Sequence, residues 1–505
     1  MIQTDSQNSR IDIMLISIVL IPALLGLLSI LLPYKKIRRG LLIAGSISHL
    51  TLTVILGFMR NNAYNTGDWI GLDNQGLLFL VITSILFLMV SIYTAGYLWR
   101  ESDRNVEDSV EGFYFRNEPE TMFIACLLFF LATMSMVCIS RHMGLLWVAI
   151  EATTLVSAPL ISFHKHHRSL EATWKYLLIC SVGIAVALLG NYFMAFAAHQ
   201  EVSLNLDKLI GNAGFLDQKW LKASFLMLLV GYGTKAGIAP MHTWLPDAHS
   251  EAPSMVSALL SGALLNCAFL GIIRSHSILF ASGLGDFSGG LLVFFGIFSI
   301  ALAAAFMIRQ TDYKRMLAYS SIEHIGILTL GAGIGGIAGT GAMLHAVNHS
   351  LTKGMLFIIS GQILYLYGTK KSSDVHNIIK TTPFTGIFWM VGFLAITGAP
   401  PFGTFISEIT ILYGIISAGR WGIAAGYLLG LGVIFIAMAR IMINMSFGGN
   451  LNSRIIEKLK GLKGVPIWYT APVVIMASII LCLGIYIPGA FFRFLADAAG
   501  LTGGL

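Results

Sequence analysis

Three ionisable residues stand in the middle of apolar runs, far from any stretch typical of a loop. Glu151 lies in GLLWVAIEATTLV, Lys235 in GYGTKAGIAP, and Glu408 directly after ITGAPPFGTF. A charged side chain near the centre of a bilayer costs about 2.5–3.5 kcal/mol on insertion scales, so such residues usually face a bundle interior or a wet cavity. We therefore expect these side chains to line an internal polar strip.

A second group of titratable residues occupies two neighbouring apolar runs. Glu323 and His324 lie in AYSSIEHIGIL, and His345, His349 and Lys353 lie in GAMLHAVNHSLTKGMLF. A step of four residues turns a helix by about 400°, so the last three side chains share one face within about 80°. A row of groups that take up and release protons is what a proton relay requires. The pattern predicts proton transfer within the membrane.

Other interpretations of these residues were less consistent with the sequence. Any one of them alone also fits a satisfied core group, but the whole set is not typical of that role. His345 and His349 have the spacing of metal ligands or of haem ligands. However, no carboxylate completes an HExxH pattern, and Lys353 on the same face would repel a cation. The sequence therefore predicts no metal and no haem.

The elements that carry these residues are predicted to be membrane-spanning helices. Of the 505 residues, 56% are hydrophobic and only 11% are charged, against about 25% charged in soluble domains. The unbroken apolar runs exclude both an ordinary soluble enzyme and a β-barrel, whose strands alternate in polarity. About fourteen runs reach spanning length. They begin near Ile11, Gly40, Gly76, Thr121, Met143, Tyr176, Ala223, Met255, Gly289, Met316, Gly335, Phe384, Gly422 and Val465.

Two of the predicted spans, the seventh and the twelfth, are interrupted by helix-breaking residues. The first break contains Gly237 and Pro240, and the second contains Gly398, Pro400 and Pro401. Proline lacks a backbone donor and glycine loosens a helix, so each break frees backbone groups that must face protein or water. The breaks are five spans apart, and an odd number of crossings reverses direction. This spacing predicts two inverted five-helix repeats around a transport pathway.

The distribution of basic residues predicts the orientation in the membrane. The net charge of +7 comes without a long basic tract, so no nucleic acid is expected as a partner. Fourteen spans place both termini on one side. If that side faces away from the cytoplasm, twenty of the 32 Lys and Arg residues fall in cytoplasmic loops and nine on the other side, and Lys235, Lys353 and Arg440 lie inside spans. We therefore expect both termini on the non-cytoplasmic side of the cell inner (plasma) membrane.

The segment GYGTKAGIAPMHTWLPDAHSEAPSMVSALLSG resembles the proton-conducting antiporter-like subunits of respiratory complex I, Mrp-type cation/proton antiporters and membrane-bound group 4 hydrogenases. The resemblance continues through RQTDYKRMLAYSSIEHIG, LHAVNHSLTKGMLFIISG and ITGAPPFGTFISE. Within the family, the S-x-E-H and N-H-S-L-T-K-G motifs are most similar to hydrogenase-4 component F. The implied all-α fold has helices 4–8 in residues 121–280 and helices 9–13 in residues 281–448. Residues 1–120 would hold helices 1–3 and a cytoplasmic loop, and residues 449–505 a loop and helix 14.

The resemblance also implies roles for individual residues. Glu151 matches a fifth-helix glutamate and Lys235 a seventh-helix lysine, a pair thought to modulate the proton affinity of the lysine. Glu408 matches the last polar residue of the twelfth helix, and Lys175 matches a sixth-helix lysine. The polar central axis is matched by His324, His345, His349 and Lys353.

One position departs from the family pattern. Many relatives carry a lysine or histidine in the eighth helix between the two half-channels, and the matching residue here is Asn266. Asparagine cannot store a proton. The link must therefore run through water or through His324 and Glu323, or this subunit conducts poorly.

Taken with the sequence, the resemblance implies a non-catalytic, proton-translocating subunit of a redox-driven complex of the hydrogenase-4 or formate hydrogenlyase type. The five cysteines lie singly, and the chain has no phosphate-binding loop or flavin motif, so no cofactor is expected. Expected partners are other antiporter-like membrane subunits and a peripheral arm with iron–sulfur subunits, either nickel–iron hydrogenase-like or NADH dehydrogenase-like. A complex I subunit and an Mrp-type antiporter subunit are alternatives. A non-conducting scaffold would instead predict polar residues that can be replaced singly without effect on pumping.

Overall fold

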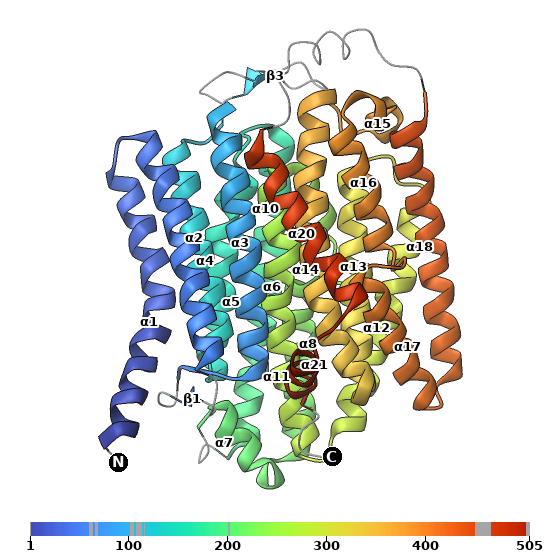
Figure 1. Ribbon diagram of the computed structural model, residues 1–505. Coiled ribbons are helices and arrows are strands. Elements are labelled where there is room, and N and C mark those ends of the chain that lie inside the picture. Colours follow the sequence, from blue (N-terminus) through green and yellow to red (C-terminus); the bar gives the residue numbers. More distant parts are fainter. Residues whose placement is uncertain are drawn as a thin grey trace.

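The computed structural model describes residues 2–59, 69–100, 117–199, 203–449 and 466–500, together with three isolated two-residue strands. Long helices run side by side and form one bundle (Figure 1). Two of the predicted cytoplasmic loops, the one around residues 101–116 and the one at residues 450–465, fall mostly outside the described part.

The first half of the chain supplies six unbroken long helices and then the first half of a broken one. The helices are α1 (Ile2–Leu31), α2 (Lys35–Phe58), α3 (Asn74–Arg100), α4 (Glu120–Ile139), α5 (Met143–Ile161), α6 (His167–Ala197), α7 (Leu206–Gly211), η1 (Ala213–Phe215) and α8 (Gln218–Ala236). Two-residue strands pair in the loops, β1 (Tyr64–Asn65) with β2 (Gly71–Leu72) and β3 (Val106–Glu107) with β4 (Tyr114–Phe115).

The second half of the chain completes the bundle. Its helices are α9 (Trp244–Glu251), α10 (Ser254–Leu259), the π-helical turn η2 (Leu260–Leu264), α11 (Leu265–Ala281), α12 (Gly285–Met307), α13 (Tyr313–Ile334), α14 (Gly336–Tyr367), η3 (Ser372–Asp374), α15 (Ile378–Thr381), α16 (Pro383–Ile396), α17 (Gly403–Ser417), α18 (Trp421–Phe447), α20 (Ile467–Ile485) and α21 (Gly489–Ala498).

Each of the fourteen predicted spans corresponds to a helix or to a pair of helices. Ten helical segments of the described part are long and apolar enough to cross a membrane: α1 to α6, the continuous α10–α11 unit, α12, α18 and α20. The other four spans are α8 with α9, α13, α14, and α16 with α17. These four contain the helix breaks or the buried ionisable residues, which shorten the helix or reduce its apolar character. The prediction of an all-α, multi-pass membrane protein is confirmed.

Glycines let neighbouring helices approach closely. A Cβ added at Gly326 of α13 would lie 2.8 Å from the carbonyl oxygen of Gly296 in α12, and one added at Gly333 would lie 2.7 Å from that of Gly289. Lipid tails are as apolar as leucine, so helix association in a membrane depends on close packing of this kind. The two glycine pairs fix α12 against α13, the helix that carries Glu323 and His324.

An ion-pair cluster ties three elements together at the end of the bundle where α3 begins. Arg274 of α11 is buried, and its guanidinium lies 3.1 Å from a carboxylate oxygen of Asp73. The same guanidinium donates to three main-chain carbonyl oxygens at the end of α4. Arg141 contacts the other oxygen of Asp73 at 2.5 Å.

We expect Asp73→Asn to lower the free energy of unfolding by about 3 kcal/mol, because it leaves the buried Arg274 without a counter-charge. Asp73 lies in the loop before α3. Burial works to raise the pKa of its carboxyl, but the charges of Arg274 and Arg141 outweigh it and hold the pKa below its usual value. The stabilisation is therefore present at neutral pH and is lost as the pH falls through the folded-state pKa. Thermal unfolding of the purified protein in detergent measures the change.

The exposed Asp286 provides the control, since it forms no ion pair with any described residue. Asp286→Asn should leave the melting temperature unchanged. Equal melting temperatures for Asp73→Asn and Asp286→Asn at neutral pH would show that the cluster does not stabilise the fold.

Candidate functional site

Both predicted helix breaks are present, and each begins with a glycine in the left-handed conformation. Gly237 ends α8 with φ at 78°, and Gly398 follows α16 with φ at 63°. Pro240 lies between α8 and α9, and Pro400 and Pro401 lie between α16 and α17. The glycines are required here because other residues rarely adopt this φ.

Side chains satisfy backbone groups that the breaks leave without helical partners. The indole of Trp244 donates to the carbonyl oxygen of Thr234 at 2.8 Å, and the amide of Ala239 donates to the hydroxyl of Ser299 at 3.0 Å. At the second break, the hydroxyl of Thr404 donates to a carbonyl oxygen near the end of α16. Non-helical backbone inside a membrane is stable when protein groups satisfy it in this way.

Lys235 lies fully buried at the end of α8 and is linked to Glu151 through a hydroxyl. Its ammonium donates to Thr154 at 2.8 Å and to the hydroxyl of Tyr176 at 2.5 Å. Thr154 in turn donates to one carboxylate oxygen of Glu151 at 3.3 Å, and Ser181 donates to the other at 3.0 Å. The lysine and the glutamate thus share a partner without forming a direct ion pair.

Three buried histidines meet where α13 and α14 pack together. Nδ1 of His324 lies 2.8 Å from Nε2 of His345, and Nδ1 of His345 lies 2.9 Å from the hydroxyl of Ser407 on α17. The ring of His349 lies 5.0 Å from that of His324, centroid to centroid. In the described part of the chain, neither ring nitrogen of His349 has a hydrogen-bond partner.

Lys353 extends this row by one turn of α14. It is fully buried, and its ammonium donates to the carbonyl oxygen of Leu317 at 2.6 Å and to the hydroxyl of Ser320. Glu323 is also buried on α13, and one of its carboxylate oxygens has no hydrogen-bond partner among the described residues. The predicted face of α14, with His345, His349 and Lys353, therefore points into the bundle.

Glu408 lies at the start of α17, beside the second break. A Cβ at Gly398 would overlap its carboxylate, so the break must carry glycine to leave room for this side chain. Ligand atoms of Glu408, His324 and His345 lie within 4.8 Å of one another, and these three residues have the composition of a metal site. However, the hydrogen bond between the two imidazoles occupies a lone pair that a metal ion would need. The geometry favours proton exchange at this cluster.

Asn266 lies at the start of α11, directly after the π-helical turn. Its amide donates to the carbonyl oxygen of Gly262 at 3.0 Å and to the hydroxyl of Ser350 on α14 at 2.8 Å. Because Ser350 follows His349 in the chain, the amide lies against the histidine-bearing helix. π-Helical turns are frequent at functional sites.

The comparison with protein families identifies the chain. Residues 140–437 match the family model described as NADH:quinone oxidoreductase/Mrp antiporter, TM. The chain belongs to this antiporter family. It is 34% identical over 389 residues to the hydrogenase-4 component F homolog of Methylacidiphilum infernorum (isolate V4), which covers 76% of this chain and 80% of that protein. The family resemblance inferred from the motifs is confirmed.

Solved structures share the fold. A chain of the membrane-bound sulfane sulfur reductase, described as an archaeal respiratory membrane complex, superposes with a TM-score of 0.83 at 20% identity. The match covers 96% of this chain and 97% of that chain. A chain of the Mrp complex from Dietzia sp. DQ12-45-1b gives a TM-score of 0.81 at 18% identity and covers 96% of both chains.

Within this antiporter-family fold, Lys175 lies apart from the buried groups. It is 46% exposed on α6, and its ammonium contacts Glu171 at 2.6 Å and Asp247 at 3.2 Å. Asp247 also pairs with Arg315 at 2.6 Å. Lys175 therefore belongs to an ion-pair network at one end of the bundle, on the loop side of the first break.

His249 is a buried titratable residue that the motif analysis did not single out. It lies on α9 and stacks on Phe357 of α14 with ring centroids 5.1 Å apart. Neither of its ring nitrogens has a hydrogen-bond partner among the described residues. Since α9 packs on both α6 and α13, this histidine lies between the two halves of the site. The sequence feature that could have identified His249 is its position in the W-L-P-D-A-H segment, next to a predicted break.

Proposed function

We propose that this chain is the proton-translocating membrane subunit of a redox-driven complex of the hydrogenase-4 type. One observation carries the proposal: buried ionisable groups lie at both helix breaks and in the helices between them. They are Lys235 at the first break, His249, Lys353, His349, His324 and His345 in the interior, and Glu408 at the second break. Structural residues alone would not require so many ionisable groups in an apolar interior.

The histidine pair provides a physical step for proton transfer. An imidazole accepts a proton at one ring nitrogen and releases another from the second nitrogen. His345 has a partner at each nitrogen, His324 on one side and Ser407 on the other. A proton that arrives through His324 can therefore leave toward Ser407, whose chain neighbour is Glu408. Rotation of the imidazole rings then restores the starting arrangement of protons on the two histidines.

The proposed assembly contains other antiporter-like membrane subunits and a peripheral redox arm with iron–sulfur subunits. The hydrogenase-4 relative supports a nickel–iron hydrogenase-like arm. The alternatives are a complex I subunit with an NADH dehydrogenase-like arm and an Mrp-type antiporter subunit without a redox arm. The last receives support from the similarity to a sodium/proton antiporter subunit of Staphylococcus haemolyticus.

Purification of the tagged chain in mild detergent, followed by reconstitution into vesicles, tests the proposal. We expect a nickel–iron hydrogenase-like large subunit to co-purify, and the vesicles to take up protons only when an electron donor and acceptor are supplied. A flavin-containing NADH-oxidising module would instead identify a complex I subunit. Sodium-coupled proton exchange without electron transfer would identify an antiporter subunit. Vesicles without any proton movement would indicate a non-conducting scaffold.

Glu151→Gln is expected to slow proton uptake several-fold without abolishing it, because the glutamate acts on Lys235 through Thr154 and the lysine itself remains. The measurement is the initial rate of acidification of the vesicle lumen. Glu171→Gln, the same substitution at a surface residue of α6, should leave the rate unchanged. A wild-type rate for Glu151→Gln would exclude the proposed coupling to Lys235.

The proposed orientation places both termini on the non-cytoplasmic side of the inner membrane. The start of α1 and the end of α21 lie at the same end of the bundle (Figure 1), which supports an even number of crossings with both termini on one side. A reporter that is active only in the cytoplasm should give no signal when fused to either terminus, and a signal when inserted at Lys371, in the loop between α14 and α15. Activity at either terminus would contradict the proposed orientation.

A further inference from the structure

Arg440 is a charged residue inside a predicted span that the proton pathway does not use. It lies on α18, seven residues before the end of the helix at Phe447, and its side chain is exposed. At a rise of about 1.5 Å per residue, this is about 10 Å from the helix end. Among the described residues it has no hydrogen-bond or ion-pair partner. A guanidinium at this depth in a bilayer requires an anion or a path to the headgroups.

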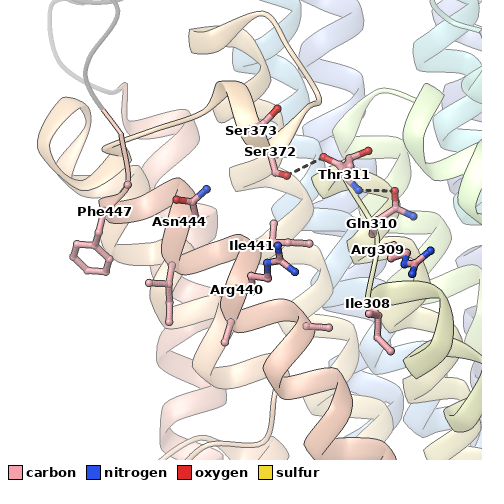
Figure 2. Close-up of a pocket in the computed structure, with 14 residues that line it drawn as sticks. Ile308, Arg309, Gln310, Thr311, Ser372, Ser373, Arg440, Ile441, Asn444 and Phe447 are labelled. Carbon is pink, nitrogen blue, oxygen red and sulfur yellow. Dashed lines mark hydrogen bonds between the residues drawn. The ribbon is translucent and has the colours of Figure 1, made fainter.

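Arg440 lines a groove of about 890 Å³ on the side of the bundle, at the end opposite the termini. One wall is α18, and the other is the end of α12 with the segment that follows it (Figure 2). Arg309 lies on this second wall and is also exposed. It too has no hydrogen-bond or ion-pair partner among the described residues, so two guanidinium groups without a partner in that part of the chain border one groove.

Neutral polar groups and an apolar floor complete the groove. Ser372, Ser373 and Asn444 line its outer part, and the hydroxyl of Ser372 donates to the carbonyl oxygen of Thr311 at 2.9 Å. Ile308, Ala437 and Ile441 contribute apolar surface beside the two arginines. None of the residues that line the groove is acidic, so the charge of the two arginines is not balanced within it.

We propose that this groove binds an anionic phospholipid, with the phosphate between Arg440 and Arg309 and an acyl chain on the apolar floor. Guanidinium groups bind phosphate through paired N–H donors, and the hydroxyls and the amide supply further polar contacts. Basic pockets between spanning helices are typical sites for anionic headgroups. The location also fits, because most of the predicted cytoplasmic loops, which are rich in Lys and Arg, lie at this end of the bundle. A free phosphate would leave the apolar floor uncovered, whereas a lipid covers it.

The test is native mass spectrometry of the intact complex after removal of bound lipid and titration with dioleoyl phosphatidylglycerol or dioleoyl phosphatidylcholine. We expect the wild-type complex to bind one phosphatidylglycerol about tenfold more tightly than phosphatidylcholine. Since one charged hydrogen-bond partner is lost, Arg440→Gln should weaken this binding about tenfold. Arg309→Gln should act in the same direction from the opposite wall. Arg420→Gln, at the other end of α18, serves as the matched control and should bind like the wild type.

Several results would overturn the proposal. Equal affinity for the two lipids, or wild-type binding by both groove variants, would show that the arginines do not select a phosphate-bearing anionic lipid. Competition by inorganic phosphate at similar concentration would identify a soluble anion as the ligand. Loss of a membrane subunit from Arg440→Gln, with lipid binding unchanged, would identify the groove as a protein interface.

Discussion

Replacing Lys235 with methionine is expected to lower redox-driven proton uptake at least about 100-fold, the scale of losing a positioned proton carrier, while the complex still assembles. Methionine keeps an unbranched side chain of similar length but cannot carry a proton. The neighbours of the lysine retain other partners, because the hydroxyl of Tyr176 lies 2.6 Å from Ser157 and Thr154 contacts Glu151. The substitution therefore leaves no buried hydroxyl isolated.

Lys222→Met is the matched control, since this lysine is exposed on the same helix, where it packs over the ring of Phe287. Proton uptake into vesicles and the subunit composition of the purified complex are measured together. Assembly of Lys235→Met with normal pumping would remove Lys235 from the pathway. Failure of this variant to assemble would assign the lysine a structural role.

His324→Ala is expected to stop proton uptake, because its ring lies nearer to each of the other two histidines than they lie to each other, 5.0 Å against 6.5 Å between ring centroids. Its ring bonds to His345 and lies 5.0 Å from His349. Alanine also leaves a cavity that water can fill. His324→Gln is therefore the second variant, since it keeps most of the volume and a hydrogen-bonding group but cannot carry a proton. Both variants should be inactive by the vesicle assay.

His276→Gln provides the control for the second prediction. This histidine lies on α11, where its ring bonds to Ser288, away from the cluster.

Glu323→Gln is expected to change the pH dependence of pumping rather than abolish it. Full pumping by both His324 variants would show that protons cross between the two half-channels by another route, most simply along a water chain past Asn266. In that case Asn266→Lys, beside Ser350 on α14, should change the rate even with His324 intact.

Much of the fold was predictable because bilayer physics acts on long windows of sequence. Apolar length located all fourteen spans, and glycine with proline located both breaks, including the left-handed Gly237 and Gly398. The domain boundaries within the chain remain predictions.

The individual ionisable residues of the candidate site were also predictable, but their pairings were not. A spacing of four places His345 and His349 on one face of α14, whereas the partner on α13 depends on how the two helices are rotated against each other. The hydrogen bond between His324 and His345 is set by that packing, and the link from Lys235 through Thr154 to Glu151 by the packing of α8 against α5. His249 was missed because a single histidine in a turn has no periodic signal.

The hydrogen bonds that side chains make at the helix breaks limit how proton transfer in this chain can be driven. Moving α8 relative to α9 would pull the indole of Trp244 from the carbonyl oxygen of Thr234, and leaving one such group unsatisfied in an apolar interior costs several kcal/mol. Side-chain rotation requires no such exposure of backbone groups. The chain is therefore suited to respond to a change in local electric field or hydration. In the proposed assembly, a redox arm can then drive the chain by changing the charge at one end of the buried row, without separating α8 from α9.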